Sequence, residues 1–355
     1  MMRDMPLSVR ADLADLPAYI PGRKIPGAIV LSSNEVSTRA PESVLAAISA
    51  AAADVNRYPQ MANDDVLVRT AEYLGVPEER VTIGAGSVAI AQQFLQAMCT
   101  EGHEVLYAWR SFEAYPIITQ IIGGRSIKVP LTADYRHDLD AMADAVTDNT
   151  RVVLVANPNN PTGTAMRAAE LERFLDRVPD HVLVVLDEAY REFVTDPEVP
   201  DGLRLAEGRE NVAVVRTFSK AYGLAGARVG YSVAPPVLTA AARKVGIPFA
   251  VNRVAQAGAI AAMDAAEELL ARCRPVTVER ERVHSALLEM GFEVPPSQAN
   301  FVWLLLGERS AAFNEHCLEQ KVVIRAFAGE GARVTVSGLP EENDAFLAAA
   351  RSFTG

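Results

Sequence analysis

Between residues 81 and 234, short apolar runs alternate with longer segments of mixed polarity. Most of the runs are continuous stretches of apolar residues, a pattern typical of strands buried on both faces of a parallel sheet. The predicted strands are residues 81–83, 104–108, 126–129, 152–156, 182–186, 212–217 and 228–234. The helices predicted between them include residues 87–98, 112–121, 139–146 and 168–177. This alternation predicts an α/β fold in which helices flank a mostly parallel seven-stranded sheet, with ligands at the carboxyl ends of the strands.

After about residue 235 the apolar pattern changes to alanine-rich helical stretches followed by short strands. The predicted elements are helices at residues 237–245, 253–290 and 341–353 and strands at residues 301–306, 322–327 and 333–336. Pro275 is expected to break or bend the second helix. These elements predict a smaller α+β domain. We expect it to comprise residues 251–355 and the Pro-rich residues 1–28, beside a large domain of residues 29–250.

Length and charge narrow the class of protein. A chain of 355 residues is too long for one compact core, which supports two domains. Half of the residues are apolar and 22% are charged, as in ordinary folded enzymes. The net charge of −11 argues against nucleic acid or an anionic membrane as the main partner.

The distribution of cysteines and apolar runs points to a cytoplasmic protein without a metal site. Cys99, Cys273 and Cys317 are widely spaced and odd in number, and no Cys-x-x-Cys or His-rich cluster occurs. The first 13 residues contain no apolar core of a signal peptide, and no apolar run approaches the roughly 18 residues that span a bilayer.

Residues 216–231 combine an amine, hydroxyl groups, a guanidinium and three glycines between two apolar runs. A lysine that attacks an aldehyde must be fixed in place and partly uncharged, and burial or nearby cations lower its pKa. Lys220 is the lysine of this segment, and Thr217, Ser219 and Arg228 are suitable donors to a phosphate dianion. An aldehyde and a phosphate on one cofactor indicate pyridoxal phosphate. A lysine flanked by Ser and Gly is more often a solvated loop residue, so the prediction depends on the other segments.

A glycine-containing segment, residues 84–89, follows one predicted strand and opens a helix, where free N–H groups attract phosphate. The same segment fits the dinucleotide fingerprint Gly-x-Gly-x-x-Ala, with Glu104 near the spacing of a ribose-binding acid. A nicotinamide-dependent dehydrogenase is therefore an alternative.

Two more segments end predicted strands. Residues 157–163 place two prolines around two asparagine amides, which either form a tight turn or hold side-chain donors rigidly at the strand end. Asp187 either caps a helix or keeps a pyridine nitrogen protonated, which makes the ring an electron sink.

Taken in order, these segments resemble the aspartate-aminotransferase superfamily of pyridoxal-phosphate enzymes, and within it the histidinol-phosphate aminotransferase subfamily. The likeness covers nearly the whole chain and includes residues 16–22, 33–35, 56–59 and 332–336. Residues 109–116 and 295–303 resemble the actinobacterial branch of aromatic-amino-acid (phenylalanine) aminotransferases. The resemblance implies reversible, ping-pong transfer of the amino group of phenylalanine or tyrosine to 2-oxoglutarate. Histidinol phosphate is the alternative amino donor.

The resemblance also implies roles for individual residues. Lys220 would be the Schiff-base lysine and the base that moves the substrate proton. Asp187 would pair with the pyridinium nitrogen, Tyr190 and Asn160 would bond the phenolate oxygen, and Phe112 would stack on the ring. The implied phosphate ligands are Ala85, Gly86, Ser87, Thr217, Ser219 and Arg228.

The remaining implied roles concern the substrate and a partner subunit. Tyr58 would reach the phosphate in the neighbouring subunit, which implies a homodimer with shared active sites, although it could be an ordinary core tyrosine. Arg333 would clamp the substrate α-carboxylate, with Asn34 nearby. Tyr19 would supply part of an apolar wall, and Arg325 would reach a substrate phosphate or a partner residue. A catalytically inactive pyridoxal-phosphate-binding protein of the same fold is a further alternative.

Overall fold

The computed structural model describes residue 10 and residues 25–354. Its centre is a seven-stranded sheet with the strand order β2-β8-β7-β6-β5-β3-β4, in which only β8 runs antiparallel to its neighbours. The strands are β2 Val81–Gly84, β3 Glu104–Trp109, β4 Arg125–Pro130, β5 Thr150–Ala156, β6 Leu183–Asp187, β7 Val212–Thr217 and β8 Gly230–Val233. The predicted α/β class, the mostly parallel sheet and its seven strands are confirmed.

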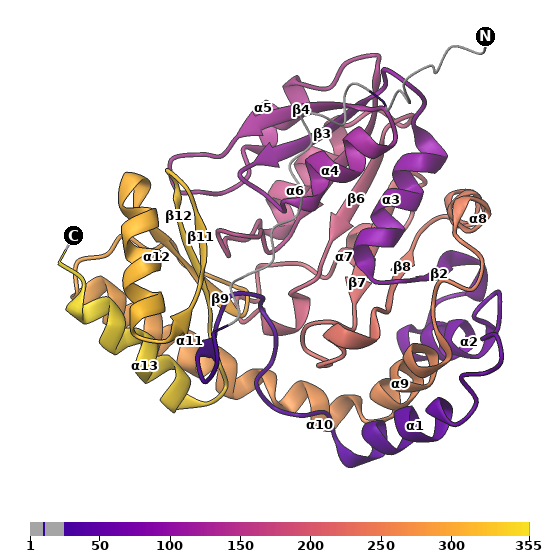
Figure 1. The fold of residues 1–355 in the computed structure, drawn as a ribbon. Coiled ribbons are helices and arrows are strands. Elements are labelled where there is room, and N and C mark those ends of the chain that lie inside the picture. Colours follow the sequence, from indigo (N-terminus) through magenta and orange to yellow (C-terminus); the bar gives the residue numbers. More distant parts are fainter. Residues whose placement is uncertain (1–9, 11–24, 355) are drawn as a thin grey trace, which may run out of the picture.

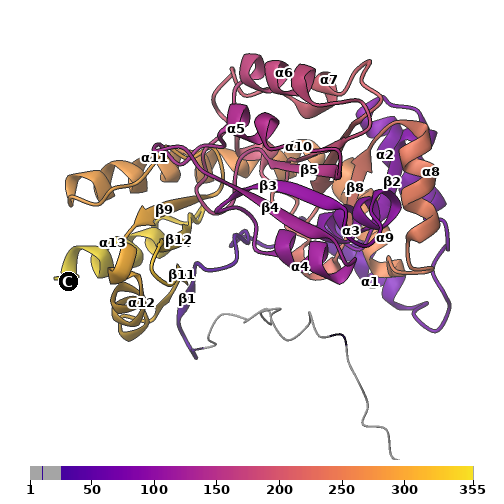
Figure 2. The ribbon, with the colours of Figure 1, turned by 90° about the horizontal axis from the view of Figure 1, so that it is seen from above.

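Helices cover both faces of this sheet (Figure 2), because successive side chains of each strand point to opposite faces. Along β3, Val105 and Tyr107 belong to an apolar cluster with α3 and α4. The intervening Leu106 belongs to a second cluster with α5 and α6. The helices are α3 Ser87–Met98, α4 Ala114–Ile121, α5 Leu139–Asp144, α6 Ala168–Arg177, α7 Gly202–Leu205 and α8 Pro236–Val245.

Several helix starts follow local rules that the sequence carries. The Asp138 side chain accepts a hydrogen bond from the Ala141 N–H at 3.0 Å and caps α5. Asn252 does the same for α9 Arg253–Asp264, and α8 begins with Pro236 at a position where the missing N–H costs no helical hydrogen bond.

The C-terminal part of the chain builds a second, smaller sheet with the order β11-β12-β9, antiparallel throughout. The N-terminal strand β1 pairs in parallel with β10, so the start of the described chain joins this smaller unit (Figure 1). Its strands are β1 Ile29–Val30, β9 Phe301–Leu305, β10 Val322–Val323, β11 Arg325–Phe327 and β12 Gly331–Thr335. Its helices are α11 Cys273–Glu289, α12 Ser310–Glu319 and α13 Pro340–Ser352. The boundaries expected for the two domains stay a prediction.

The prediction of one helix over residues 253–290, interrupted at Pro275, is wrong. The segment forms three helices, α9 Arg253–Asp264, α10 Ala266–Ala271 and α11, which are separated at Ala265 and Arg272. Pro275 is the third residue of α11, where the backbone N–H has no intrahelical partner to lose.

Other differences are smaller. The strand predicted at residues 322–327 is divided at Ile324 into β10 and β11. Helices α1 Glu42–Ala52 and α2 Asp64–Leu74, which the apolar pattern did not predict, pack against α9. Among the helices that the structure describes, none has the length and apolar character needed to cross a membrane.

Candidate active site

A cavity of about 480 Å³ lies where the carboxyl ends of the large-sheet strands face the smaller sheet. Eleven of the residues predicted to form the site line this cavity, although they come from distant parts of the sequence. They are Asn34, Ser87, Phe112, Asn160, Asp187, Tyr190, Thr217, Ser219, Lys220, Arg228 and Arg333. The position is the one expected for ligands of an open α/β sheet.

Lys220 lies just beyond β7, and its amine faces the cavity. The Nζ atom donates a hydrogen bond to the Ser33 carbonyl oxygen at 2.9 Å and lies 5.8 Å from the centre of the Tyr190 ring. Loss of hydration, together with the cationic Arg333 and Arg228, lowers the pKa of this amine to about 7. A substantial fraction of the amine is therefore neutral near neutral pH and able to act as nucleophile or base.

Asp187, the last residue of β6, presents its carboxylate to the same cavity. It accepts hydrogen bonds from the Tyr115 hydroxyl at 3.0 Å and from the Ala189 N–H at 3.2 Å. Burial raises the pKa of Asp187 to about 6, and the neighbouring charge of Glu188 adds to this effect. Because a cation would favour the charged form, the site suits a protonated ring nitrogen. Tyr115 was not predicted, although it lies on α4 one helical turn after Phe112.

Asn34, which is held by Thr335 of the smaller sheet, positions the Tyr190 hydroxyl. It accepts a hydrogen bond from the Asn34 side-chain amide at 3.0 Å. Asn34 has a left-handed backbone (φ +55°) and is held by Thr335, whose hydroxyl accepts from the Asn34 N–H at 2.9 Å and donates to the Asn34 side chain at 3.1 Å. Asn34 was predicted to contact substrate, and the structure adds a contact to Tyr190. No signal in the sequence pointed to Thr335.

Arg333, on β12, reaches from the smaller sheet into the cavity. Its guanidinium donates to the Asn160 side-chain oxygen and to the Ser32 carbonyl oxygen, each at 2.6 Å. The side chain is nearly buried and lies 5.6 Å from the centre of the Phe301 ring. Arg333, predicted to bind the substrate carboxylate, and Asn160, predicted to bind the cofactor ring, are thus in direct contact.

The turn between β2 and α3 has the shape of an anion site. Gly86, with φ +87°, directly precedes α3, and a Cβ atom there would lie 2.6 Å from the Arg228 guanidinium. A Cβ atom at Gly230 would lie 2.7 Å from the Ser87 backbone nitrogen. These glycines therefore leave the N-terminus of α3 open beside Arg228, which also donates to the Ser219 hydroxyl at 3.1 Å.

The donor set fits pyridoxal phosphate. The phosphate would lie at the start of α3 beside Arg228, where both the backbone N–H groups and the guanidinium favour an anion. The ring nitrogen would face Asp187, and the aldehyde carbon would face Lys220. Ala85 and Gly86 belong to the same turn, although their side-chain positions do not line the cavity.

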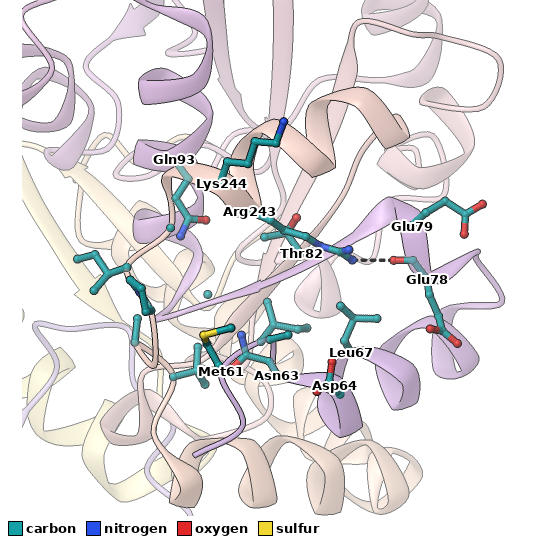
Figure 3. Close-up of a pocket in the computed structure, with 18 residues that line it drawn as sticks. Met61, Asn63, Asp64, Leu67, Glu78, Glu79, Thr82, Gln93, Arg243 and Lys244 are labelled. Atoms are coloured by element: carbon teal, nitrogen blue, oxygen red, sulfur yellow. Dashed lines mark hydrogen bonds between the residues drawn. The ribbon is translucent and has the colours of Figure 1, made fainter. Parts of the chain in front are cut away.

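A second, larger cavity of about 620 Å³ lies beside β2 and α8 (Figure 3). Its walls carry charges of both signs, including Asp64, Glu78, Arg243 and Lys244. Arg243 donates to the Glu78 carbonyl oxygen at 2.8 Å. Lys220, Asp187 and the predicted phosphate donors Ser87, Thr217, Ser219 and Arg228 line the smaller cavity together, so we place the chemistry there.

Besides Ala85 and Gly86, two predicted site residues lie outside the lining of the smaller cavity, and one lies outside the described residues. Tyr58 is 79% exposed and its ring lies 4.8 Å from that of Phe249, so the interpretation as a core tyrosine is wrong. Arg325 forms an ion pair with Glu113, at 2.9 and 3.1 Å. Tyr19 belongs to the residues that the structure does not describe.

The geometry gives no support to the dinucleotide fingerprint. Glu104 is the first residue of β3, at the strand end opposite to the cavity. Its carboxylate accepts hydrogen bonds from the hydroxyls of Thr147 at 2.7 Å and Thr150 at 3.0 Å and pairs with Arg125. In addition, β3 is not the neighbour of β2 in the sheet, as a dinucleotide-binding βαβ unit requires.

Comparisons with known proteins agree with this geometry. A family model described as aminotransferase class I and II matches residues 26–350. The aromatic amino acid aminotransferase of Streptomyces coelicolor is 55% identical over 97% of both chains, and that of Rhodococcus jostii is 56% identical over 97% of this chain and 95% of its own. The crystal structure of histidinol-phosphate aminotransferase from Sinorhizobium meliloti in complex with pyridoxal-5′-phosphate superimposes with a TM-score of 0.88 at 29% identity, covering 98% of each chain.

Proposed function

Because the chain belongs to the class I and II aminotransferases, we propose that it transfers the amino group of phenylalanine or tyrosine to 2-oxoglutarate, reversibly. The observation that carries the reaction type is the meeting of the Lys220 amine and the Asp187 carboxylate in one cavity at the strand ends. The aromatic substrate is supported by relatives more than 50% identical over nearly the whole chain that are named aromatic amino acid aminotransferases.

The cofactor is pyridoxal 5′-phosphate, which when bound supplies an electron-accepting ring for the amino group and the α-carbon of the substrate. Thr217, Ser219 and Arg228, with the turn at residues 85–87, hold its phosphate in our proposal. Asp187 keeps the ring nitrogen protonated, because a buried carboxylate is stabilised by a cation.

The chain's own groups then move one proton and hold the substrate. The Lys220 amine, partly neutral near pH 7, would move the proton between the substrate α-carbon and the C4′ carbon of the cofactor. Arg333 binds the α-carboxylate with the paired N–H geometry of a guanidinium. Its contacts with Asn160 and the Ser32 carbonyl fix the plane of that guanidinium before the substrate arrives.

The cavity lining supports a neutral aromatic side chain. Apolar groups contribute much of its wall, with Phe112 on the side of the β3–α4 loop. The ring of phenylalanine or tyrosine needs such a wall, whereas the phosphate ester of histidinol phosphate needs a cationic socket.

We expect phenylalanine and tyrosine to be better amino donors than histidinol phosphate on a single preparation. The measurement is kcat/KM for the three donors with 2-oxoglutarate as acceptor. A preference for histidinol phosphate of about a hundredfold, roughly 2.7 kcal/mol in transition-state binding, would instead establish the histidinol-phosphate aminotransferase activity. A protein that takes up pyridoxal phosphate but reacts with no amino acid would be a non-catalytic member of the family.

We further propose a homodimer in which Tyr58 completes the phosphate site of the partner subunit. The Tyr58 side chain is exposed on the surface. Met61, three residues further along the chain, is exposed as well, and so are Ile247 and Phe249, of which Phe249 contacts the Tyr58 ring. Exposed apolar side chains gathered in this way are typical of a protein interface.

Replacing Tyr58 by Ala is expected to weaken pyridoxal-phosphate binding by tenfold or more, because a hydrogen bond to a charged group contributes about 1.5–3 kcal/mol. The dissociation constant is measured by absorbance titration, with circular dichroism as the test of folding. Tyr58→Phe is the matched variant, which keeps the ring and loses only the hydroxyl, and it should weaken binding similarly. A fully active monomer in sedimentation would contradict the shared site.

A cytoplasmic location is the last part of the proposal. The three cysteines, Cys99, Cys273 and Cys317, are all unpaired and buried, and unpaired thiols are typical of proteins kept in a reducing compartment.

A further inference from the structure

Two ion pairs connect the loop between β3 and α4 with the hairpin of β11 and β12. Arg325 on β11 donates to both carboxylate oxygens of Glu113, at 2.9 and 3.1 Å. Arg110 pairs with Glu330, which lies in the turn of the hairpin, and its guanidinium lies 4.3 Å from the centre of the Trp109 ring. The loop therefore has a defined position against the smaller sheet.

The Glu113–Arg325 pair lies at the edge of the active-site cavity. Glu113 stands between Phe112 and Ala114, both of which line the cavity. Arg325 is the direct cross-strand partner of Arg333, so the two side chains lie on the same face of the β11–β12 pair. Both members of the ion pair are largely shielded, with 20% of the Arg325 side chain and 28% of the Glu113 side chain exposed.

The charge balance at this edge depends on Glu113. Without its carboxylate, Arg325 and Arg333 would be neighbouring guanidinium groups beside one cavity, an arrangement that suits a phosphate dianion. With Glu113 in place, the charge of Arg325 is compensated, and a phosphate brought to this edge would face a carboxylate at close range. Phenylalanine and tyrosine carry only the smaller, singly charged α-carboxylate in the place of that phosphate, and Arg333 alone can bind it, so they meet less repulsion.

We propose that the Glu113–Arg325 ion pair determines donor specificity by excluding phosphate-bearing amino donors from this active site. The inference rests on the proposed function, since it explains why a chain of this fold prefers aromatic amino acids. Glu113 is a specificity-determining residue here, and it takes no part in proton transfer.

Glu113→Gln tests the proposal, because glutamine keeps the shape and one acceptor oxygen for Arg325 but removes the negative charge. We expect the ratio of kcat/KM for histidinol phosphate to that for phenylalanine to rise at least tenfold, equivalent to about 1.4 kcal/mol. The value for phenylalanine itself should change less than about threefold. An unchanged ratio would overturn the proposal.

Two further variants locate the effect. In the double variant Glu113→Gln with Arg325→Gln, both charges are gone and the ratio should return to within about threefold of the wild-type value. A tenfold fall below wild type would mean that Arg325 already serves a phosphate in the native enzyme, which also overturns the proposal. Glu330→Gln is the matched control, because it removes one carboxylate from the same loop–hairpin contact, and its ratio should stay at the wild-type value.

Binding of phenyl phosphate provides a readout without turnover, since this aromatic phosphate ester has no amino group. In calorimetric titrations of the cofactor-loaded enzyme, Glu113→Gln should bind it at least tenfold more tightly than wild type, and the double variant should not. The proposed function and this inference fail differently. A wild-type enzyme that prefers histidinol phosphate contradicts both, whereas a wild-type enzyme that prefers phenylalanine, with no gain in Glu113→Gln, contradicts only the role of the ion pair.

Discussion

Replacing Lys220 by Ala is expected to lower kcat for phenylalanine at least about 10⁴-fold, because the variant lacks the group that moves the substrate proton. General base catalysis alone contributes about 10²–10⁴, and the covalent attachment of the cofactor to the amine is lost as well. Lys220 is the lysine of the cavity lining, and its amine has its pKa lowered to about 7 by burial and by Arg333 and Arg228. Turnover is measured under saturating pyridoxal phosphate, so that weak binding does not imitate a catalytic defect.

Lys220→Arg separates the amine chemistry from the charge. A guanidinium keeps the cation but is never deprotonated near neutral pH, so this variant should be as inactive as Lys220→Ala. In both variants, borohydride treatment should no longer attach the cofactor to the protein. Wild-type turnover in either one would remove Lys220 from its assigned role.

The large sheet was predictable from the sequence because its strands are buried on both faces. Residues 152–156 and 212–215 are apolar throughout and buried, so these runs have no polar face. Continuous apolar runs of this kind between helical segments are typical of the inner strands of a parallel sheet. The site residues Asn160, Asp187 and Lys220 each follow such a strand. Their approach to one another therefore follows from the parallel arrangement of the strands.

The parts that were missed depend on contacts between distant segments. Helix α1 consists mainly of alanine and other apolar residues and has no clear polar face, so it was not recognised. The pairing of β1 with β10 involves only two residues in each strand and joins opposite ends of the chain. The contacts of Thr335 with Asn34 and of Arg325 with Glu113 also join segments that are far apart in the sequence. A local sequence pattern cannot predict a partner hundreds of residues away.

Tyr115 illustrates the limit within the site itself. The helix containing it was predicted, but its hydroxyl was not assigned a function because a buried tyrosine on an apolar helix face is ordinarily part of the core. Only the folded chain brings α4 across the end of β6, where that hydroxyl donates to Asp187. This hydrogen bond lowers the pKa of Asp187 and so partly offsets the rise that burial causes.

Asp187→Asn is expected to lower kcat for phenylalanine by about two to three orders of magnitude while the protein stays folded. Asparagine has nearly the same shape as aspartate but cannot stabilise a protonated ring nitrogen. Loss of one partner of a buried, hydrogen-bonded charge pair typically costs about 2–5 kcal/mol, which corresponds to roughly 30- to 5000-fold in rate. The measurement is the single-turnover rate with phenylalanine at saturating cofactor. A rate within threefold of wild type would contradict the pairing of Asp187 with the ring.

Tyr115→Phe is the control that links this effect to the ionisation of Asp187. Removing the hydroxyl takes away a hydrogen bond that favours the carboxylate, so the pKa of Asp187 rises in this variant. Asp187 must be deprotonated to support the cofactor, and activity is lost as the pH falls through its pKa. The acidic limb of the kcat profile should therefore move to higher pH in Tyr115→Phe, with little change at the plateau. In Asp187→Asn that limb should disappear, because no carboxylate remains to titrate there, and a limb retained at the wild-type position would assign it to another group.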